Sequence, residues 1–387
     1  MKEPTPAAGL QPGTGIIENY RKETSMNQSL WVSGMVLVVA GLAAAQEVPP
    51  REVIPIRTDG KVVPPEVLQQ IYEEVKTPYK YGIVIDAEKG SVDCPAVFRH
   101  GDKWYMMYIA YVGRGYETHI AESADLLVWK ELGKIMSFAE DANAWDANQT
   151  AGYIALQDHQ WGGSCTLQQY DRKYWLSYFG GSTTGFEKGK LGIGIASTDD
   201  PAAVKPWNRL ESNPVLTPDQ PDARGWEKTK LFKSNVIWDK SGSLGYPFVM
   251  YYNAALGKQE CIGMAVSKDM KQWLRYGKDP VVAGGTISGD PQIVKIGDVW
   301  VMFYFMFVMG GNKTFDTFAC SYDLATWTKW NGKHLIEPSE PWDIAAAHKP
   351  WIIKHDGVVY HYYCACKKGK RAIGLATSKD LKGTEKK

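Results

Sequence analysis

Ionisable residues stand immediately before three apolar, strand-like runs that begin with proline. Asp93 and His348 each lie two residues before such a proline, and Asp290 lies directly before another. A charge at the start of an apolar strand is costly to bury without a purpose. Each residue taken singly would suit a strand cap or a tie to a neighbouring unit, but the three together favour a chemical site. Hydrolysis of a glycosidic bond needs such an inventory: a proton donor, a carboxylate, and a group that tunes the donor.

Further polar and aromatic residues share the same predicted end of the strands. Glu117 and Glu260 begin third strands, which run back from the face where the first strands begin. Because third strands lie farther from the axis, we expect these two acids at the rim of the site rather than among its catalytic groups. Trp161 lies beside a Gly-Gly-Ser segment and would suit the face of a sugar ring. The residues predicted to contact a substrate are Glu117, His119, Trp161, Ser164, Asn235, Glu260 and Lys349.

One sequence pattern recurs along the chain and predicts the elements that position these residues. Each copy runs from an apolar strand through a turn to a strand that ends in tyrosine, and a Ser-x-Asp-like motif follows. Three copies begin with proline and have equal lengths, a fourth begins with Cys165, and a fifth has a longer turn. The copies span 95–108, 165–178, 234–252, 291–304 and 350–363, and the motifs span 120–126, 195–201, 265–271, 319–325 and 376–382.

The repeats predict an all-β fold, a five-bladed β-propeller with a short N-terminal helical arm. One small antiparallel sheet leaves its edges exposed, whereas several in a ring protect one another. We expect the propeller over 79–387, with residues 79–86 as a strand that completes the last blade. Residues 46–78 form the arm, in which Pro64 and Pro65 open a short amphipathic helix. An open array or a sandwich of similar strands is the alternative.

The N-terminal region predicts export. Residues 30–45 form an apolar run of 16 residues, shorter than the roughly 20 that a membrane span needs. The run ends in three alanines, which satisfies the small-residue rule for signal cleavage. We therefore predict a signal peptide at 26–45, cleaved near Ala45, and a non-native upstream extension at 1–25, so the mature protein would be periplasmic or extracellular. An uncleaved signal anchor is the alternative.

Composition and cysteine spacing argue against several classes of partner. The chain has 44 Lys and Arg against 43 Asp and Glu, so no net charge favours nucleic acid or an anionic membrane surface. Its six cysteines have no compact disulfide spacing, and most lie in strand-like runs, so we interpret them as buried thiols. The sequence contains no common metal or nucleotide motif, so we predict neither cofactor nor metal.

Two segments carry a resemblance to a known group of enzymes. The sequences SVDCPAVF at 91–98 and SGDPQIV at 288–294 resemble the blade starts of the five-bladed glycoside hydrolase families 43, 32 and 117, and the C-terminal repeats look closest to family 117. Membership would imply an exo-acting, inverting α-1,3-(3,6-anhydro)-L-galactosidase and a homodimer formed through the N-terminal arm. It would also imply Asp93 as general base, His348 as general acid and Asp290 as the group that orients or tunes the acid. A related anhydro-sugar or furanose substrate is equally compatible with the sequence.

Two other functions stay open at this point. Lys233, Lys349 and His348 could hold phosphate, which would make the protein a glycoside phosphorylase or a transglycosylase. A carbohydrate-binding propeller without catalysis is the alternative from a different class, although clustered titratable residues favour an enzyme.

Overall fold

The computed structural model describes residues 51–87, 90–311 and 313–383. The predicted upstream extension and signal peptide lie outside these residues. Within the described part of the chain, no helix is long and apolar enough to cross a membrane.

The described chain is mostly β, with one α-helix, α1 at Pro65–Val75, and two short 3-10 helices, η1 at Gly225–Glu227 and η2 at Met309–Gly311. The strands of its first half are β1 Tyr79–Asp86, β2 Ser91–His100, β3 Lys103–Tyr111, β4 Tyr116–Ser123, β5 Lys130–Met136, β6 Gln149–Ile154, β7 Tyr174–Gly181, β8 Gly192–Thr198 and β9 Asn208–Arg209. Those of its second half are β10 Lys230–Trp238, β11 Phe248–Leu256, β12 Gln259–Ser267, β13 Trp273–Arg275, β14 Ile287–Ile296, β15 Val299–Val308, β16 Lys313–Ser321, β17 Thr328–Lys329, β18 Ala346–His355, β19 Val358–Lys367 and β20 Lys370–Thr377.

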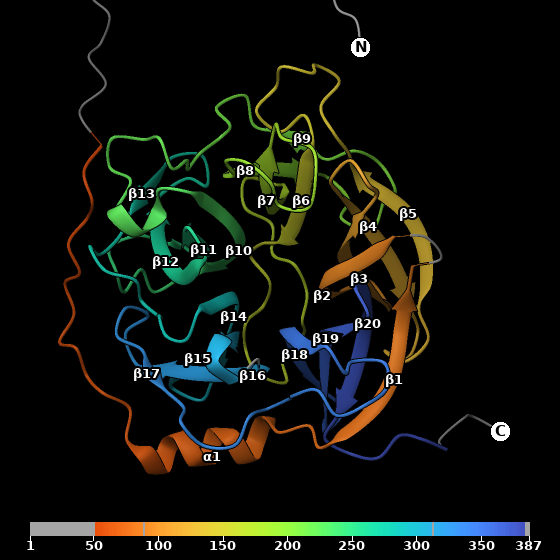
Figure 1. The fold of residues 1–387 in the computed structure, drawn as a ribbon. Helices are drawn as coiled ribbons and strands as arrows, with labels where there is room; N and C mark the ends of the chain where they lie inside the picture. The colour runs from red at the N-terminus through yellow and green to blue at the C-terminus, as the bar shows by residue number, and fades with distance from the viewer. Residues whose placement is uncertain (1–50, 88–89, 312, 384–387) are drawn as a thin grey trace, which may run out of the picture. The chain divides into compact units, whose positions relative to one another are not determined.

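The strands form antiparallel groups of four that follow one another along the chain. Sheets β2-β3-β4-β5 and β6-β7-β8-β9 are separate, whereas β10–β13 and β14–β17 are joined into one sheet by a single parallel pair, Glu260 with Ile287. Each group contacts the next, and β18 and β20 of the last contact β2 of the first. Figure 1 shows the groups around one central region, which β2, β10, β14 and β18 approach.

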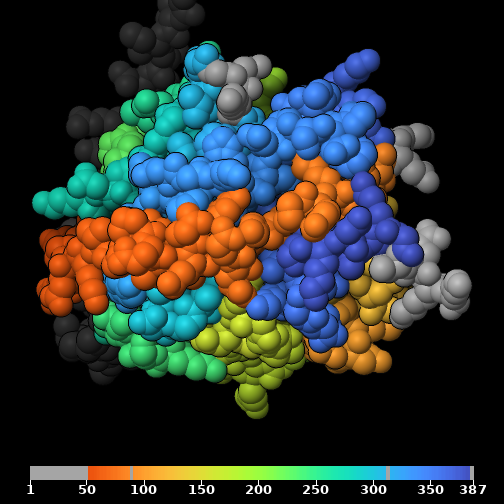
Figure 2. Space-filling view, turned by 90° about the horizontal axis from the view of Figure 1, so that it is seen from below, coloured from red at the N-terminus to blue at the C-terminus, as the bar shows by residue number. Residues whose placement is uncertain are grey.

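The N-terminal part of the described chain completes and covers this arrangement. Strand β1 pairs antiparallel with β20, as the sequence predicted for residues 79–86. Helix α1, at the expected position, buries Leu68, Ile71 and Val75 in a cluster with residues of β14, β15 and β16. In Figure 2 the orange N-terminal segment forms a band across blue segments of the later sheets.

The recurrent Ser-x-Asp motif is a turn that ends a third strand. In one copy the Ser267 hydroxyl accepts a hydrogen bond from the Met270 amide at 3.0 Å, and the Asp269 carboxylate accepts from two later amides. Met270 adopts a left-handed conformation with φ 64°, and Trp273 follows with its indole N–H donating to the Met270 carbonyl at 3.0 Å. The same hydroxyl–carboxylate pattern ends β4 and β16. The motif therefore recurs because each sheet needs the same reversal.

The second repeat departs from the predicted alignment. Its first strand was expected to begin near Cys165, but the inner strand is β6, which lies before that residue. The run Ala151–Leu156 is buried and provides the apolar inner strand, so Cys165 falls in a long excursion between β6 and β7. The predicted start of this copy at Cys165 is therefore wrong, whereas its final residue, Tyr178, lies in the second strand β7 as expected.

This excursion crosses the end of the central region opposite to the strand starts. The Leu156 amide donates to a carbonyl of β10, the Gln157 side chain to a carbonyl near the end of β2, and the Trp161 amide to a carbonyl near the end of β14. One segment thus spans three groups of strands at their far ends. This segment therefore covers part of the far end of the central region.

Candidate functional site

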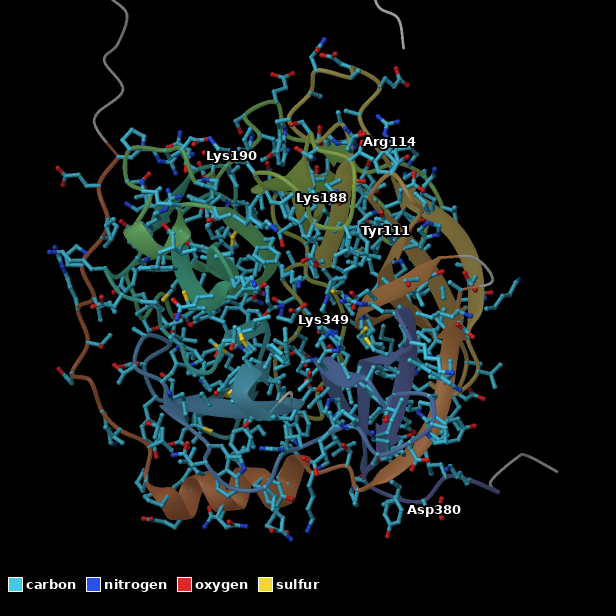
Figure 3. All side chains as sticks on the ribbon, viewed as in Figure 1. Tyr111, Arg114, Lys188, Lys190, Lys349 and Asp380 are labelled. Atoms are coloured by element: carbon cyan, nitrogen blue, oxygen red, sulfur yellow. The ribbon has the colours of Figure 1, made fainter. Side chains whose placement is uncertain are left out.

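Four inner strands share a bulge at the place where they begin, whereas the inner strand β6 has none. The pairing register shifts in β2, β10, β14 and β18, and a residue with positive φ occupies each shift. These residues are Cys94, Lys233, Asp290 and Lys349, with φ values of 49°, 50°, 56° and 64°. Left-handed backbone at residues other than glycine is costly and concentrates at functional sites. The bulges turn charged side chains toward the centre, where Figure 3 places Lys349.

Asp93 is fully buried and held by cations. Its Oδ2 accepts a hydrogen bond from Lys349 Nζ at 2.7 Å and another from Arg371, while the Tyr116 hydroxyl lies 3.3 Å away. Its Oδ1 accepts from the Cys94 amide at 2.9 Å. Burial alone would raise the pKa of Asp93, but Lys349 and Arg371 hold it well below its usual range. A carboxylate with this many hydrogen bonds and cationic partners is a poor proton acceptor and serves to neutralise the neighbouring cations.

A second ion cluster lies beside the first. Lys233 Nζ is 3.3 Å from Glu187 Oε1 and 3.6 Å from Asp290 Oδ2. Both of these carboxylate oxygens are buried and lack a hydrogen-bond partner among the described residues. Burial raises the pKa of Glu187, but Lys233 and then Lys349 outweigh it and lower the value. Glu187 is therefore an ionised carboxylate with an oxygen available to a ligand.

Glu187 reaches the centre from the loop between β7 and β8. The Gln149 side chain fixes this loop by donating to the carbonyls of Thr183, at 3.2 Å, and Gly185. Lys230 Nζ donates to the backbone carbonyl of Glu187 itself at 2.5 Å. The Gly185 amide of the same loop donates to the Arg114 carbonyl of the β3–β4 turn at 2.8 Å, and Figure 3 labels Lys188 and Arg114 in these two segments. The loop is a fixed wall of the site, since its backbone is held at three points.

Glu260 is a carboxyl group whose pKa is shifted in the opposite direction to that of Glu187. It lies at the start of β12, and the Asn253 amide donates to its Oε2 at a long 3.4 Å. Asn253 also accepts the backbone N–H of Asp290 at 2.8 Å, which links β11 to the bulge of β14. Burial raises the pKa of Glu260, although Lys233 opposes the shift. A cavity of about 190 Å³ adjoins Glu260 and includes Trp226, an aromatic surface for a sugar ring.

A small cavity of about 20 Å³ lies between the bulges. A more open cavity of about 510 Å³ lies beside β7 and β8, and no residue of the central clusters lines it. The central cavity is lined by Cys94, Pro95, Tyr153, Lys233, Ser234, Asp290, Pro291, Lys349, Pro350 and Trp351.

The structure brings together only part of the predicted site. Asp93, Asp290 and Lys349 meet at the centre, and Lys233 and Lys349 both oppose the rise in the pKa of Glu260. His348 lies at the start of β18, with Nδ1 3.2 Å from the Cys364 carbonyl and its ring against Phe305. Among the described residues, no hydrogen bond joins His348 to Asp93 or Asp290.

The other predicted contact residues have structural partners. Glu117 pairs with Lys134 at 2.8 Å, and His119 packs against a tyrosine of β3. Asn235 accepts the Ile293 amide at 3.1 Å, which ties β10 to β14.

Trp161 and Ser164 do not reach the central clusters. They were predicted there because the start of the second repeat was placed at Cys165 instead of in β6. The Trp161 indole N–H donates to Glu74 Oε1 of α1 at 2.7 Å, and the Ser164 hydroxyl donates to Asp158 at 2.6 Å, both within or beside the far-end excursion. Glu187 and Arg371 lie in the central clusters but were not predicted from the sequence. The signal for both was topological: the β7–β8 loop and the start of β20 share the face of the strand starts.

Comparison with known proteins identifies first the fold and then the family. No family model matches the chain, and no curated protein does. A solved structure described as a thermostable family-43 glycoside hydrolase is 16% identical, with a TM-score of 0.55 over 76% of this chain and 92% of that chain, which shows a shared fold.

Two solved structures are much more similar. One, described as a complex of BT0996 and RGII, is 47% identical and covers 83% of this chain and 97% of the other protein, with a TM-score of 0.79. Another, described as "Glycoside hydrolase", has the same identity and TM-score and covers 82% of this chain and 96% of the other protein. This chain belongs to the glycoside hydrolases.

Proposed function

We propose that this glycoside hydrolase releases a terminal sugar, with Glu260 as general acid and Glu187 as the ionised carboxylate that activates water. The observation that carries this proposal is the opposite shift of the two pKa values: burial raises the pKa of Glu260 and favours its protonated form, whereas Lys233 and Lys349 lower the pKa of Glu187 and favour its ionised form. Two carboxyl groups whose surroundings push their pKa values apart are the usual acid and base of sugar hydrolysis.

This assignment replaces the roles that the family 117 resemblance implied. Asp93 is engaged by two cations and a backbone amide, so it has little capacity to accept a proton. His348 is hydrogen-bonded to the Cys364 carbonyl and to neither central aspartate within the described chain, a geometry that does not suit a general acid. Asp290 keeps a supporting role, because its Oδ2 faces Lys233 and is available to a sugar hydroxyl.

Several finer features belong to the same proposal. We interpret the groups of four strands as five propeller blades, counting the joined sheet as two because a single residue pair connects its halves. Exo action is supported by the excursion that crosses the far end of the central region. Inversion rests on the family 117 resemblance alone. A furanose or anhydro-sugar is proposed as the terminal residue, and the complex of the similar protein makes an RGII oligosaccharide the first candidate.

The test is product release from a panel of oligosaccharides by the purified full-length protein. The panel contains RGII oligosaccharides, neoagarobiose, arabino-oligosaccharides and fructo-oligosaccharides, each with and without phosphate, and a Glu187→Gln variant controls for contaminating enzymes. We expect a terminal sugar to appear without phosphate. A sugar phosphate that forms only with phosphate would establish a phosphorylase. Binding of one panel member without release would favour a carbohydrate-binding propeller.

Two expectations about the N-terminal region are proposals as well. We expect export with cleavage near Ala45, and a homodimer in which the exposed side of the arm contacts a second copy. N-terminal sequencing of protein secreted from cells should begin at Gln46, and light scattering should give twice the mass of one chain. An intact Met1 would contradict cleavage. A monomeric mass would contradict the dimer. The described part of the arm packs on its own chain, so only its outward side would be available to a second copy.

A further inference from the structure

Three potential metal ligands gather at the start of β18, beside the central clusters. His348 of β18 is paired directly with Cys364 of β19, and Cys366 lies two residues further along β19. Side chains two residues apart in a strand share a face, and directly paired residues of neighbouring strands do too. The ligand atoms of the three residues all lie within 4.8 Å of one another, and the two sulfur atoms are 3.7 Å apart.

The dimensions of this cluster match those of a tetrahedral zinc centre. Two thiolates bound to one Zn²⁺ at about 2.3 Å place their sulfur atoms about 3.8 Å apart. The pair therefore needs almost no rearrangement to bind an ion, whereas a disulfide would require the sulfurs to approach to about 2.05 Å. Sulfur and imidazole ligands also select zinc over Mg²⁺ or Ca²⁺, which prefer oxygen.

The histidine is oriented as metal ligands usually are. Its Nδ1 lies 3.2 Å from the backbone carbonyl of Cys364, and an N–H donated there leaves the Nε2 lone pair available. The ring of Phe305 packs against the imidazole at a centroid distance of 5.1 Å and an angle of 76°, which restricts its rotation. His348 is 6% exposed and Cys364 is fully buried, so the cluster is built into the sheet.

We propose that His348, Cys364 and Cys366 bind one Zn²⁺ ion. A water molecule or a solute atom completes the coordination, since three protein ligands leave a fourth position open. Two thiolates balance the charge of the ion, so it can lie beside Arg371, which is paired with Cys366. Lys349 directly follows His348 in the bulge of β18, so the ion would fix the backbone that aims Lys349 at Asp93.

The test is zinc binding by the full-length protein, kept reduced, loaded with zinc and dialysed. We expect one zinc per chain by elemental analysis, and thiolate-to-metal charge-transfer absorption after loading with Co²⁺ instead. Cys364→Ser, Cys366→Ser and His348→Ala should each lose stoichiometric zinc and the absorption band. Cys261→Ser is the matched control, because Cys261 is partly buried in β12, outside the cluster, and should keep both.

Two results would overturn the proposal. One is less than a tenth of a zinc per chain in wild-type protein whose six thiols all react under denaturing conditions. The other is zinc binding that the three cluster variants leave unchanged. If Cys364→Ser fails to fold, Cys366→Ser carries the test, because Cys366 is 9% exposed and near the end of its strand. None of these readouts depends on the substrate or on turnover, so the zinc proposal is tested independently of the proposed function.

Discussion

Replacing Glu260 by glutamine is expected to lower kcat on a natural oligosaccharide by roughly 10²–10⁴-fold, the usual contribution of general acid catalysis. Glutamine keeps the size and the contact with Asn253 but has no proton to give the leaving oxygen. The loss should nearly disappear on an aryl glycoside whose leaving group needs no protonation. The measurement is kcat for both substrates with wild-type and variant protein.

The pH profile gives the same prediction a direction. Burial raises the pKa of Glu260, so wild-type activity should fall on the alkaline side as this acid loses its proton, and the variant should lack that limb. The acidic limb should remain, because it reports protonation of Glu187, whose pKa is lowered. Glu117→Gln is the control. Glu117 pairs with Lys134 near the start of β4, so its replacement should alter neither limb of the pH profile. An equal loss on both substrates would exclude Glu260 as the acid.

Replacing Asp93 by asparagine is expected to lower the free energy of unfolding by about 3–5 kcal/mol, the cost of leaving a buried charge without its partner. The variant keeps the shape of the side chain but removes the carboxylate that pairs directly with Lys349 and Arg371. Chemical denaturation of both proteins measures the difference. The matched control is Asp86→Asn, which removes an exposed ion pair with Lys370 and should change stability by roughly 1 kcal/mol or less.

Asp93 also determines the direction in which the stability of the protein changes with pH. The folded pKa of Asp93 is depressed, so its stabilising contribution is present above the unfolded pKa and is lost as the pH falls through the folded value. Because the folded value lies well below 3.8, the contribution should persist through mildly acidic conditions. A variant as stable as wild type that has nonetheless lost turnover would contradict this role and restore Asp93 as general base.

Much of the fold was predictable because the same turns and bulges recur in several of the sheets. The Ser-x-Asp motif marks a reversal with a left-handed residue such as Met270, and such a turn leaves a sequence signature wherever it occurs. Pro95, Pro291 and Pro350 mark bulges in three inner strands for a similar reason. The second repeat failed because β6 is short and has neither signal, so a coincidental match at Cys165 replaced it.

The site was predictable only where it follows the repeat. Asp93, Asp290 and Lys349 lie at bulges, and alignment of the repeats is enough to find them. Glu187 lies in a loop of irregular length, and no periodicity in sequence says that Gln149 and Lys230 hold that loop over the centre. The pairing of His348 with Cys364 likewise depends on the register of two strands, which the spacing of the cysteines does not reveal.

The pairing of β1 with β20 has a consequence for the order of events during synthesis. Strand β1 leaves the ribosome early but has no partner until the last strand has been made, so the fold cannot close on a partial chain. Contacts between such distant segments form slowly, because a long loop must be ordered first. Strand β20 also carries Arg371, which completes the charge balance of Asp93. A nascent chain therefore lacks the ion pair of Arg371 with Asp93 until β20 has been made, and a premature stop before β20 removes this ion pair and the β1–β20 pairing together.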